Sequence, residues 1–321
     1  MNSTTVLVTG ATGFIGRHLV PALIDAGFDV RGQYRKQQGQ NPVVEWRRFD
    51  FDKEADLRSL VHGCKAIIHL AAEIADPGKM DRLNVGITRA LAKTAVEQGV
   101  SYFGHASSIV VYGSPRQADV DESTSLIDPL SSIDRQYSAE PYMLEYARTK
   151  ALGEMALLPF ISDIQIDILR PSVVVDSHGY LQPIRWKTAR RALHMHRRTQ
   201  YIHVGDVVAA LVFLLRRSIA GGQTGFVPYN ICDDRSGTYQ ALFSALLSRE
   251  HTAPMLPRGL ITNLDLAKDM IKHRRLEVRY PLGLLNFENK RLRETGFTAP
   301  IGWDRALAEA LALAAPGHKL A

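Results

Sequence analysis

Thr9-Gly10-Ala11-Thr12-Gly13-Phe14-Ile15-Gly16 begins where a short apolar run, residues 6–8, stops and a helical pattern starts. Glycines at intervals of three residues allow a tight turn, a close approach of the backbone to a phosphate and close packing of a helix against a strand. Free N–H groups at the start of a helix attract negative charge. The stretch therefore predicts a dinucleotide-binding loop formed by Gly10, Thr12, Gly13, Phe14, Ile15 and Gly16.

Downstream of this loop, short apolar runs alternate with amphipathic stretches, as a parallel sheet covered by helices requires. The pattern predicts strands near residues 6–9, 29–34, 44–49, 66–70, 102–106 and 164–169. It predicts helices near residues 14–26, 57–62, 81–98 and 142–160. We therefore expect an α/β fold with a doubly wound parallel sheet, a Rossmann fold.

The alternation becomes irregular after Arg170-Pro171, and residues 221–225 are typical of a turn. We expect residues 1–171 to form the dinucleotide-binding domain. Residues 172–321 are expected to form mainly a smaller α/β substrate-binding region, with a segment at about 200–217 returning to the first domain.

Composition is typical of an enzyme with a full-size core, since 45% of the 321 residues are hydrophobic. No apolar run reaches the roughly 20 residues of a membrane span, and the N-terminus carries no basic-then-apolar leader. The two cysteines, Cys64 and Cys232, cannot form a disulfide framework and lie in no metal-ligand cluster. We expect a cytoplasmic protein without a metal or a membrane partner.

The formal net charge of +6 favours anionic partners. Basic residues recur at helical spacing between Arg185 and Arg198, as a solvated face or as a site for a substrate phosphate. We expect a small-molecule substrate rather than nucleic acid.

A second motif, Tyr146-Ala147-Arg148-Thr149-Lys150, places a phenol and an ammonium four residues apart on one helix face. A nearby cation favours the phenolate and lowers the tyrosine pKa toward the working range of a general acid or base. The alternative is a tyrosine that only packs the helix. Ser107 and Ser108 end a predicted strand, at the edge of a parallel sheet where ligands bind.

In this order, the glycine loop, the Ser-Ser…Tyr-Gly segment and the Tyr-x-x-x-Lys helix resemble the extended short-chain dehydrogenase/reductase family. The resemblance is to the branch of NAD(P)-dependent nucleotide-sugar epimerases, dehydratases and ketoreductases. Further matches are His69-Leu70-Ala71-Ala72, Leu169-Arg170-Pro171 and the run from Tyr201 to Asp206, so the likeness spans nearly the whole chain.

This resemblance implies that Tyr146 is the catalytic acid/base and that Lys150 lowers its pKa and holds the cofactor ribose. It implies that Ser108, rather than Ser107, orients the reacting carbonyl or hydroxyl; the alternative is a cap at the strand end. The cofactor is implied to contact Asp50, Phe51, Leu70, Ala71, Ala72, Pro171 and Val173, besides Tyr146 and Lys150. A homodimer packed through residues 81–98 and 142–160 is also implied.

The end of the second predicted strand indicates which cofactor is preferred. NAD-binding enzymes carry an acid there for the ribose 2′-hydroxyl, but residues 30–44 contain none. Tyr34 stands at that position, followed by Arg35 and Lys36, and a guanidinium suits a 2′-phosphate. We expect NADP(H), with NAD(H) as the alternative; Arg35 could instead stack on adenine or face water.

Three hypotheses on function follow. The first is an NADP-dependent oxidoreductase that reduces or epimerises a keto or hydroxy centre of a nucleotide-activated sugar. The second is a carbonyl reductase of a nonpolar small molecule, as in the hydroxysteroid and dihydroflavonol branch, which the short segment after Pro171 favours. In the epimerases an arginine often stands where Thr199 lies, although Arg197 and Arg198 are close by. The third is a non-enzymatic NAD(P)-sensing protein.

Overall fold

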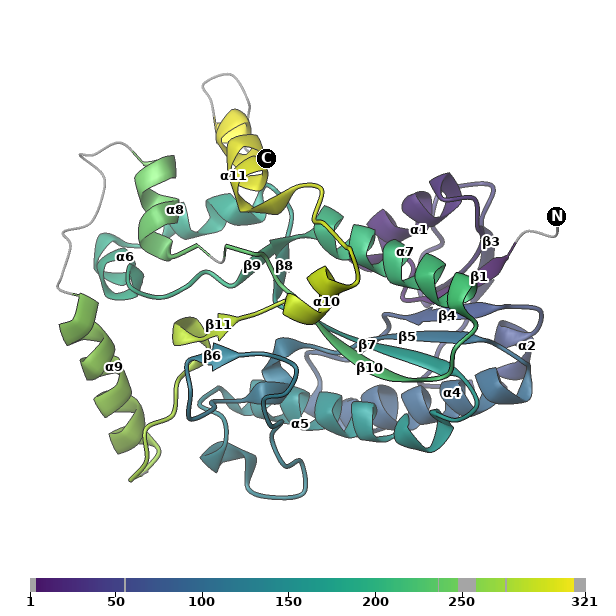
Figure 1. The fold of residues 1–321 in the computed structure, drawn as a ribbon, viewed down its shortest axis with the longest axis horizontal. Helices are drawn as coiled ribbons and strands as arrows, with labels where there is room; N and C mark the ends of the chain where they lie inside the picture. Colours follow the sequence, from purple (N-terminus) through teal and green to yellow (C-terminus); the bar gives the residue numbers. More distant parts are fainter. Residues whose placement is uncertain (1–3, 55, 236, 248–257, 275, 315–321) are drawn as a thin grey trace.

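The computed structural model describes residues 4–54, 56–235, 237–247, 258–274 and 276–314. A seven-stranded sheet runs through its centre in the order β10-β7-β5-β4-β1-β2-β3, with every neighbouring pair parallel (Figure 1). The strands are β1 (Thr5–Thr9), β2 (Asp29–Tyr34), β3 (Glu45–Arg48), β4 (Ala66–His69), β5 (Tyr102–Ala106), β7 (Gln165–Pro171) and β10 (Gly225–Ile231). The expected doubly wound sheet is confirmed.

The strand order reverses between β1 and β4, because the chain builds β1 to β3 outward and then returns to the other side of β1. Ligands of such sheets bind beyond the carboxyl ends of the strands at this switch point. The glycine loop follows β1, and Leu70, Ala71 and Ala72 follow β4. Both segments therefore lie at the position where the fold receives a ligand.

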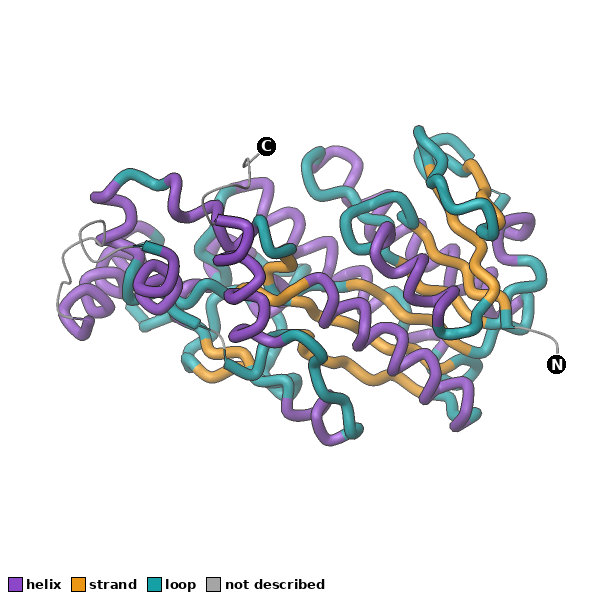
Figure 2. The backbone as a smooth tube through the Cα atoms, turned by 90° about the horizontal axis from the view of Figure 1, so that it is seen from above, coloured by secondary structure: helices purple, strands orange, loops and turns teal. Residues whose placement is uncertain are grey.

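Helices cover both faces of the sheet, and the alternation of buried side chains along β1 shows why. Val6 and Val8 pack in one apolar cluster with α1 (Gly16–Asp25) and α7 (Val204–Gly221). Leu7 faces the opposite cluster with α2 (Arg58–Val61) and α4 (Ile87–Glu97). Figure 1 shows α1 and α7 above the strands and α4 below them, and in the view from above the helices overlie the strands (Figure 2).

β10 is a strand that the sequence pattern did not predict. It contains Pro228, which cannot donate a ladder hydrogen bond and is tolerated on an edge strand. Because β10 pairs only with β7, at the end of the sheet, the proline is accommodated. The segment beyond residue 171 thus contributes both β10 and α7 to the layers around the sheet.

The other elements gather beyond the carboxyl edge of the sheet and along its sides. Two small parallel pairs are β8 (Val173–Val175) with β9 (Tyr201–His203), and β6 (Asp119–Val120) with β11 (Asn286–Phe287). The helices are α3 (Pro77–Met80), π-helical η1 (Asp81–Gly86), η2 (Ile109–Tyr112), η3 (Ile133–Arg135), α5 (Pro141–Met155), η4 (Leu158–Phe160), η5 (Gly179–Arg185), α6 (Thr188–His194), α8 (Tyr239–Leu246), α9 (Arg258–Lys272), η7 (Leu282–Leu284), α10 (Lys290–Glu294) and α11 (Gly302–Ala314). Among the described residues, no helix has the length and apolar character needed to cross a membrane.

Candidate functional site

The glycine loop is a backbone cradle with no room for side chains at two of its glycines. Gly10 has φ +65°, and a Cβ there would lie 3.0 Å from the Ala71 nitrogen. A Cβ at Gly16 would overlap the Gly10 carbonyl oxygen. The Gly13 N–H donates to that oxygen at 2.9 Å and closes the turn. The missing side chains let β1, α1 and the segment after β4 approach closely, as a pyrophosphate cradle requires.

Gln33 holds this loop, and sequence reasoning missed it. Its side-chain oxygen accepts from the Gly10 N–H at 2.8 Å, and its amide donates to the Phe49 carbonyl at 2.6 Å. Gln33 is buried in β2. The feature of the sequence that could have indicated this role is a glutamine within a predicted strand, because a buried side-chain amide needs hydrogen-bond partners.

Ser108 and Tyr146 come together across the gap between the end of β5 and α5. A side-chain hydrogen bond joins them. Burial raises the pKa of Tyr146 to about 12, and the bond with Ser108 opposes this rise only in part. The direction is opposite to the lowering that the Tyr-Lys spacing predicts. The phenol is neutral in this arrangement, so it is held as a proton donor.

Lys150 shares the helix face with Tyr146, but its ammonium is directed elsewhere. Nζ donates to the Ala106 carbonyl at 2.5 Å and lies 5.9 Å from the centre of the Tyr146 ring. Burial lowers the pKa of Lys150 to about 8, and the Glu154 carboxylate counteracts this effect. The ammonium is bound to a backbone carbonyl and lies 5.9 Å from the ring centre, and burial, not this cation, dominates the tyrosine pKa.

Ser107 is turned away from this pair. Its hydroxyl donates to Glu154 at 2.5 Å, and its N–H donates to the Leu169 carbonyl at 2.7 Å. Ser108 also accepts from the Val110 N–H at 3.3 Å, so it caps η2 while it contacts Tyr146. The structure therefore brings Ser108, and not its neighbour, to the tyrosine.

His69 is a core histidine at the end of β4. Its ring nitrogens lie 2.7 Å from Thr9 Oγ1 and 3.1 Å from Thr88 Oγ1, and the ring stacks on His105 with centroids 5.5 Å apart. Burial lowers the pKa of His69 to about 3. The ring is therefore neutral and supports the strand end from within.

The remaining expected cofactor contacts are divided between the surface and the core. Phe51 is buried against the His69 ring, and Pro171 is buried at the end of β7. Asp50 accepts from the Asp52 N–H at 3.1 Å, and Val173 is 41% exposed on β8. Asp50 and Val173 are thus accessible at the surface, whereas Phe51 packs in the core against His69.

Three cations line a cavity beside the glycine loop. The cavity has a volume of about 790 Å³ and is lined by Ala11, Thr12, Arg17, Val20, Pro21, Arg35, Lys36, Gln37, Gln38, Gly39, Gln40, Asn41 and Trp46. Arg35 and Lys36 come from the end of β2, as expected, with Tyr34 packed edge-on against Trp46. Arg17, on the first turn of α1, is an addition that sequence reasoning missed. The Arg17 guanidinium lies over the Phe14 ring, 5.0 Å from its centre. The feature of the sequence that could have indicated this role is a cation directly after Gly16, the last glycine of the loop.

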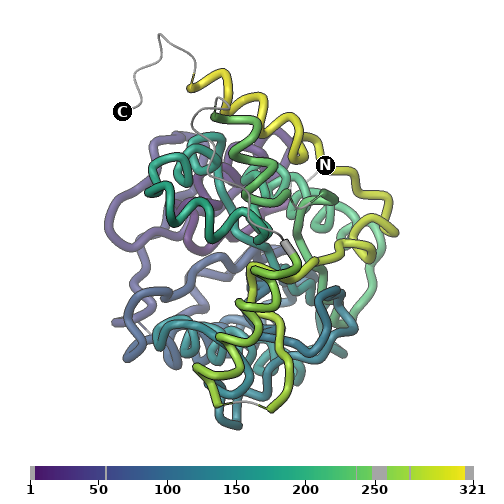
Figure 3. Tube along the Cα trace, turned by 90° about the vertical axis from the view of Figure 1, so that its left-hand side faces the viewer, coloured from purple at the N-terminus to yellow at the C-terminus, as the bar shows by residue number. Residues whose placement is uncertain are grey.

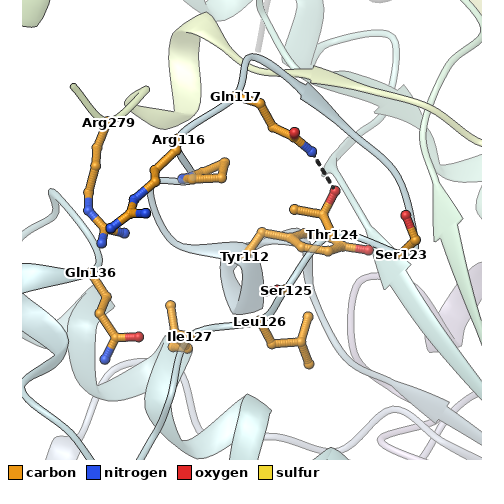
Figure 4. Close-up of a pocket in the computed structure, with 11 residues that line it drawn as sticks. Tyr112, Arg116, Gln117, Ser123, Thr124, Ser125, Leu126, Ile127, Gln136 and Arg279 are labelled. Carbon is orange, nitrogen blue, oxygen red and sulfur yellow. Dashed lines mark hydrogen bonds between the residues drawn. The ribbon is translucent and has the colours of Figure 1, made fainter. Parts of the chain in front are cut away.

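A second cavity, of about 480 Å³, lies between the segment after η2 and Arg279 (Figure 4). Arg116 and Arg279 stand on one side of it, and both pair with Glu277. Tyr112 lines it as well and donates a hydrogen bond to Asn230 at 2.7 Å. The cavity is polar, and its two arginines share one carboxylate, that of Glu277.

Known proteins resemble this chain along most of its length. Sterol demethylase protein B of Methylococcus capsulatus is 25% identical over 311 residues, covering 91% of this chain and 89% of the relative. Dihydroflavonol 4-reductase of Hordeum vulgare is 24% identical over 299 residues, covering 82% and 80%.

Solved structures share the fold. A short-chain dehydrogenase/reductase superfamily protein from Agrobacterium tumefaciens with bound NAD has a TM-score of 0.73 at 22% identity, covering 96% of each chain. A UDP-galactose 4-epimerase has a TM-score of 0.67 at 20% identity, covering 97% of this chain and 99% of that chain.

The sequence model of the NAD dependent epimerase/dehydratase family matches residues 6–175, more than half of the chain. This range contains the glycine loop, Ser108, Tyr146 and Lys150. The resemblance noted from the motifs is confirmed. The chain belongs to the NAD dependent epimerase/dehydratase family and is an NAD(P)-dependent enzyme of the extended short-chain dehydrogenase/reductase type.

Proposed function

We propose that this enzyme is an NADP(H)-dependent carbonyl reductase that acts on a nonpolar small molecule. The observation that carries the proposal is the convergence of Arg17, Arg35 and Lys36 on one cavity beside the glycine loop. Three cations suit a 2′-phosphate, and an arginine can bind it through two hydrogen bonds. A preference for NADP(H) supports net reduction, because an epimerase returns its hydride and consumes no reductant.

The residues present fit a dinucleotide. Gly10 and Gly16 leave room for a pyrophosphate at the start of α1, and the cationic cavity lies beyond the end of β2. A bound nicotinamide supplies the hydride. Ser108 would orient the substrate oxygen, and Tyr146, kept neutral by burial, would donate the proton to it. Lys150 would hold the cofactor ribose.

The substrate class is inferred from an arginine that is already paired. Arg197, the first candidate for a pyrophosphate-binding cation near Thr199, donates to Asp265 at 2.8 and 2.6 Å. Thr199 itself is buried and donates to the Gly237 carbonyl at 3.1 Å. These contacts weaken the nucleotide-sugar hypothesis. The similarity to a dihydroflavonol 4-reductase supports the reduction of a nonpolar carbonyl.

A nucleotide-activated sugar stays the second candidate because α6 carries exposed cations. Arg190 lies over the Trp186 ring at 4.2 Å, and Lys187 is exposed beside it. The arrangement of a guanidinium on an aromatic ring suits a nucleotide diphosphate.

The test measures the oxidation of NADPH and NADH with two panels, aromatic or alicyclic ketones and UDP-sugars. We expect NADPH oxidation with a member of the first panel and none with the second. Interconversion of a UDP-sugar without net NADPH oxidation would contradict the proposal and favour an epimerase.

A further inference from the structure

Helix α9 has a well-anchored inner face. It lies at the end of the molecule opposite the N-terminus (Figure 1), and it stands in front when that end faces the viewer (Figure 3). Asp265 is bound by His196 Nε2 at 2.9 Å and Arg197 Nη2 at 2.6 Å. Asp269 lies 3.8 Å from His273. Asp265 thus joins the inner face to the body of the protein, whereas the contact of Asp269 with His273 is local to the end of the helix.

The outer face of α9 carries an apolar stripe. Leu260 and Leu264 are each 59% exposed, and Ile271 is 78% exposed. With exposed Ala267 they occupy positions i, i+4, i+7 and i+11, which fall within a sector of about 60° on a helix of 3.6 residues per turn. Single exposed apolar residues are ordinary, but a stripe along a whole helix indicates a docking surface.

Cations border this stripe on the outer face. Lys268, at position i+8, lies about 40° beyond the edge of the stripe, Lys272 is exposed at the end of the helix, and Arg274 is exposed just beyond it. Both acids of the described helix are on the inner face, with side chains only 18% and 9% exposed. The outer face therefore combines apolar and positive groups.

The charges on the outer face indicate which kind of surface α9 can bind. A second copy of the same helix has the spacing needed to pair with the stripe, but it would bring lysines against lysines. An anionic lipid surface complements both features, because apolar side chains enter the acyl region while lysine stems reach back to the headgroups. Helices of this kind lie in the plane of the interface.

We propose that α9 docks on the surface of an anionic phospholipid bilayer, with Leu260, Leu264 and Ile271 inserted and Lys268 and Lys272 at the headgroups. The docking is peripheral, since no described helix could span the bilayer. It differs from the expectation of no membrane partner, which rested on the search for spanning segments. It does not depend on which carbonyl compound the enzyme reduces.

The test is cosedimentation of the purified full chain with vesicles of phosphatidylcholine, with and without phosphatidylglycerol. We expect binding to the anionic vesicles, weakened at least about tenfold by L264E combined with I271E. Lys268→Glu and Lys272→Glu, each made alone, should weaken it about fivefold. The matched control is Val43→Glu, which changes a 70% exposed valine just before β3, at the opposite end of the molecule from α9 (Figure 1), and should leave binding unchanged.

Thermal unfolding of each variant checks that the fold is intact. If L264E with I271E does not fold, the two single lysine variants provide the test of binding. The proposal is overturned if the wild-type chain stays in the supernatant with anionic vesicles, or if the stripe variants bind as well as wild type. It is also overturned if sedimentation in solution shows an oligomer that L264E with I271E disperses, because the stripe would then bind a second copy.

Discussion

Glu154 binds Arg170 through two hydrogen bonds in the core, from Nε to Oε1 at 3.0 Å and from Nη2 to Oε2 at 2.6 Å. Their side chains are 3% and 4% exposed, and the same carboxylate accepts the hydroxyl of Ser107. Because Ser107 precedes Ser108 and Glu154 lies one turn after Lys150, the Glu154 carboxylate joins the end of β5 and α5, which carry the site, to Arg170 on β7. Pairing also explains how two charged side chains, Arg170 and Glu154, can be buried in the core.

Removing the carboxylate should cost stability. In Glu154→Gln the Arg170 guanidinium keeps its burial and loses its counter-charge, so we expect the free energy of unfolding to fall by about 3–5 kcal/mol. Urea denaturation measures it. The control is Glu294→Gln, whose partner Lys290 is 3.7 Å away with both side chains over 60% exposed, and which should cost under about 1 kcal/mol. Similar losses in both variants would contradict this account of the ion pair.

If Tyr146 is the proton donor proposed above, replacing its phenol should abolish proton donation without disturbing the fold. We expect Tyr146→Phe to lower kcat by about 10²–10⁴-fold while the Kd for the cofactor stays near that of wild type. Tyr142→Phe is the matched control, since Tyr142 is 47% exposed on the same helix. Turnover by Tyr146→Phe at the wild-type rate would remove Tyr146 from the mechanism.

The buried lysine makes stability depend on pH. Folding lowers the pKa of Lys150 from 10.5 to about 8 because burial disfavours its charge. Below pH 8 the ammonium is charged in both states and its cost is fully present. Between pH 8 and pH 10.5 the folded protein releases the proton first, so the free energy of unfolding should rise with pH, by up to about 3 kcal/mol.

The measurement compares urea denaturation at pH 7.5 and pH 10 for wild type and Lys150→Met. Burial also raises the pKa of the Cys64 thiol, a second buried group that titrates on the alkaline side, so the difference between the two proteins is the quantity of interest. We expect the lysine-dependent rise to be missing in Lys150→Met. An equal pH dependence in both proteins would show that the ammonium is not paying a burial cost.

Gly39 fixes the wall of the cationic cavity. A Cβ there would overlap the Trp46 indole, which donates to the Asn41 carbonyl at 2.9 Å. We expect Gly39→Ala to lower the free energy of unfolding by about 1–3 kcal/mol and to shift the tryptophan fluorescence. Gly221→Ala is the control, because no atom lies within 4 Å of its added Cβ. Equal unfolding curves for both variants would mean that the loop adapts freely.

Much of the first half of the fold is predictable because local pattern and tertiary role agree there. β2 and β5 have the expected bounds, and the helix expected over 81–98 is found as η1 followed by α4. The π-helical turn was not predictable, since it inserts one residue per turn without a change in hydrophobic pattern. β10 was missed because an edge strand tolerates Pro228, a residue that argues against a strand when the sequence is all there is.

The candidate site was predictable in its residues but not in its electrostatics. The spacing of Tyr146 and Lys150 places both on one helix face. It does not reveal that the Ala106 carbonyl takes the ammonium or that burial dominates the pKa of the phenol. Gln33 and Arg17 were missed because their roles depend on contacts with residues far along the chain or on a cavity that only the folded loop creates.

The most direct test of the proposed reductase is calorimetric titration with NADP⁺ and NAD⁺ of the wild-type chain, Arg17→Ala and Arg35→Ala. The account predicts at least about tenfold tighter binding of NADP⁺ to wild type, as one lost charge-assisted contact is worth about 1.5–3 kcal/mol. Each variant should lose most of that preference while its affinity for NAD⁺ stays the same. Tighter binding of NAD⁺ by the wild-type chain, or an NADP⁺ preference unchanged in both variants, would contradict it.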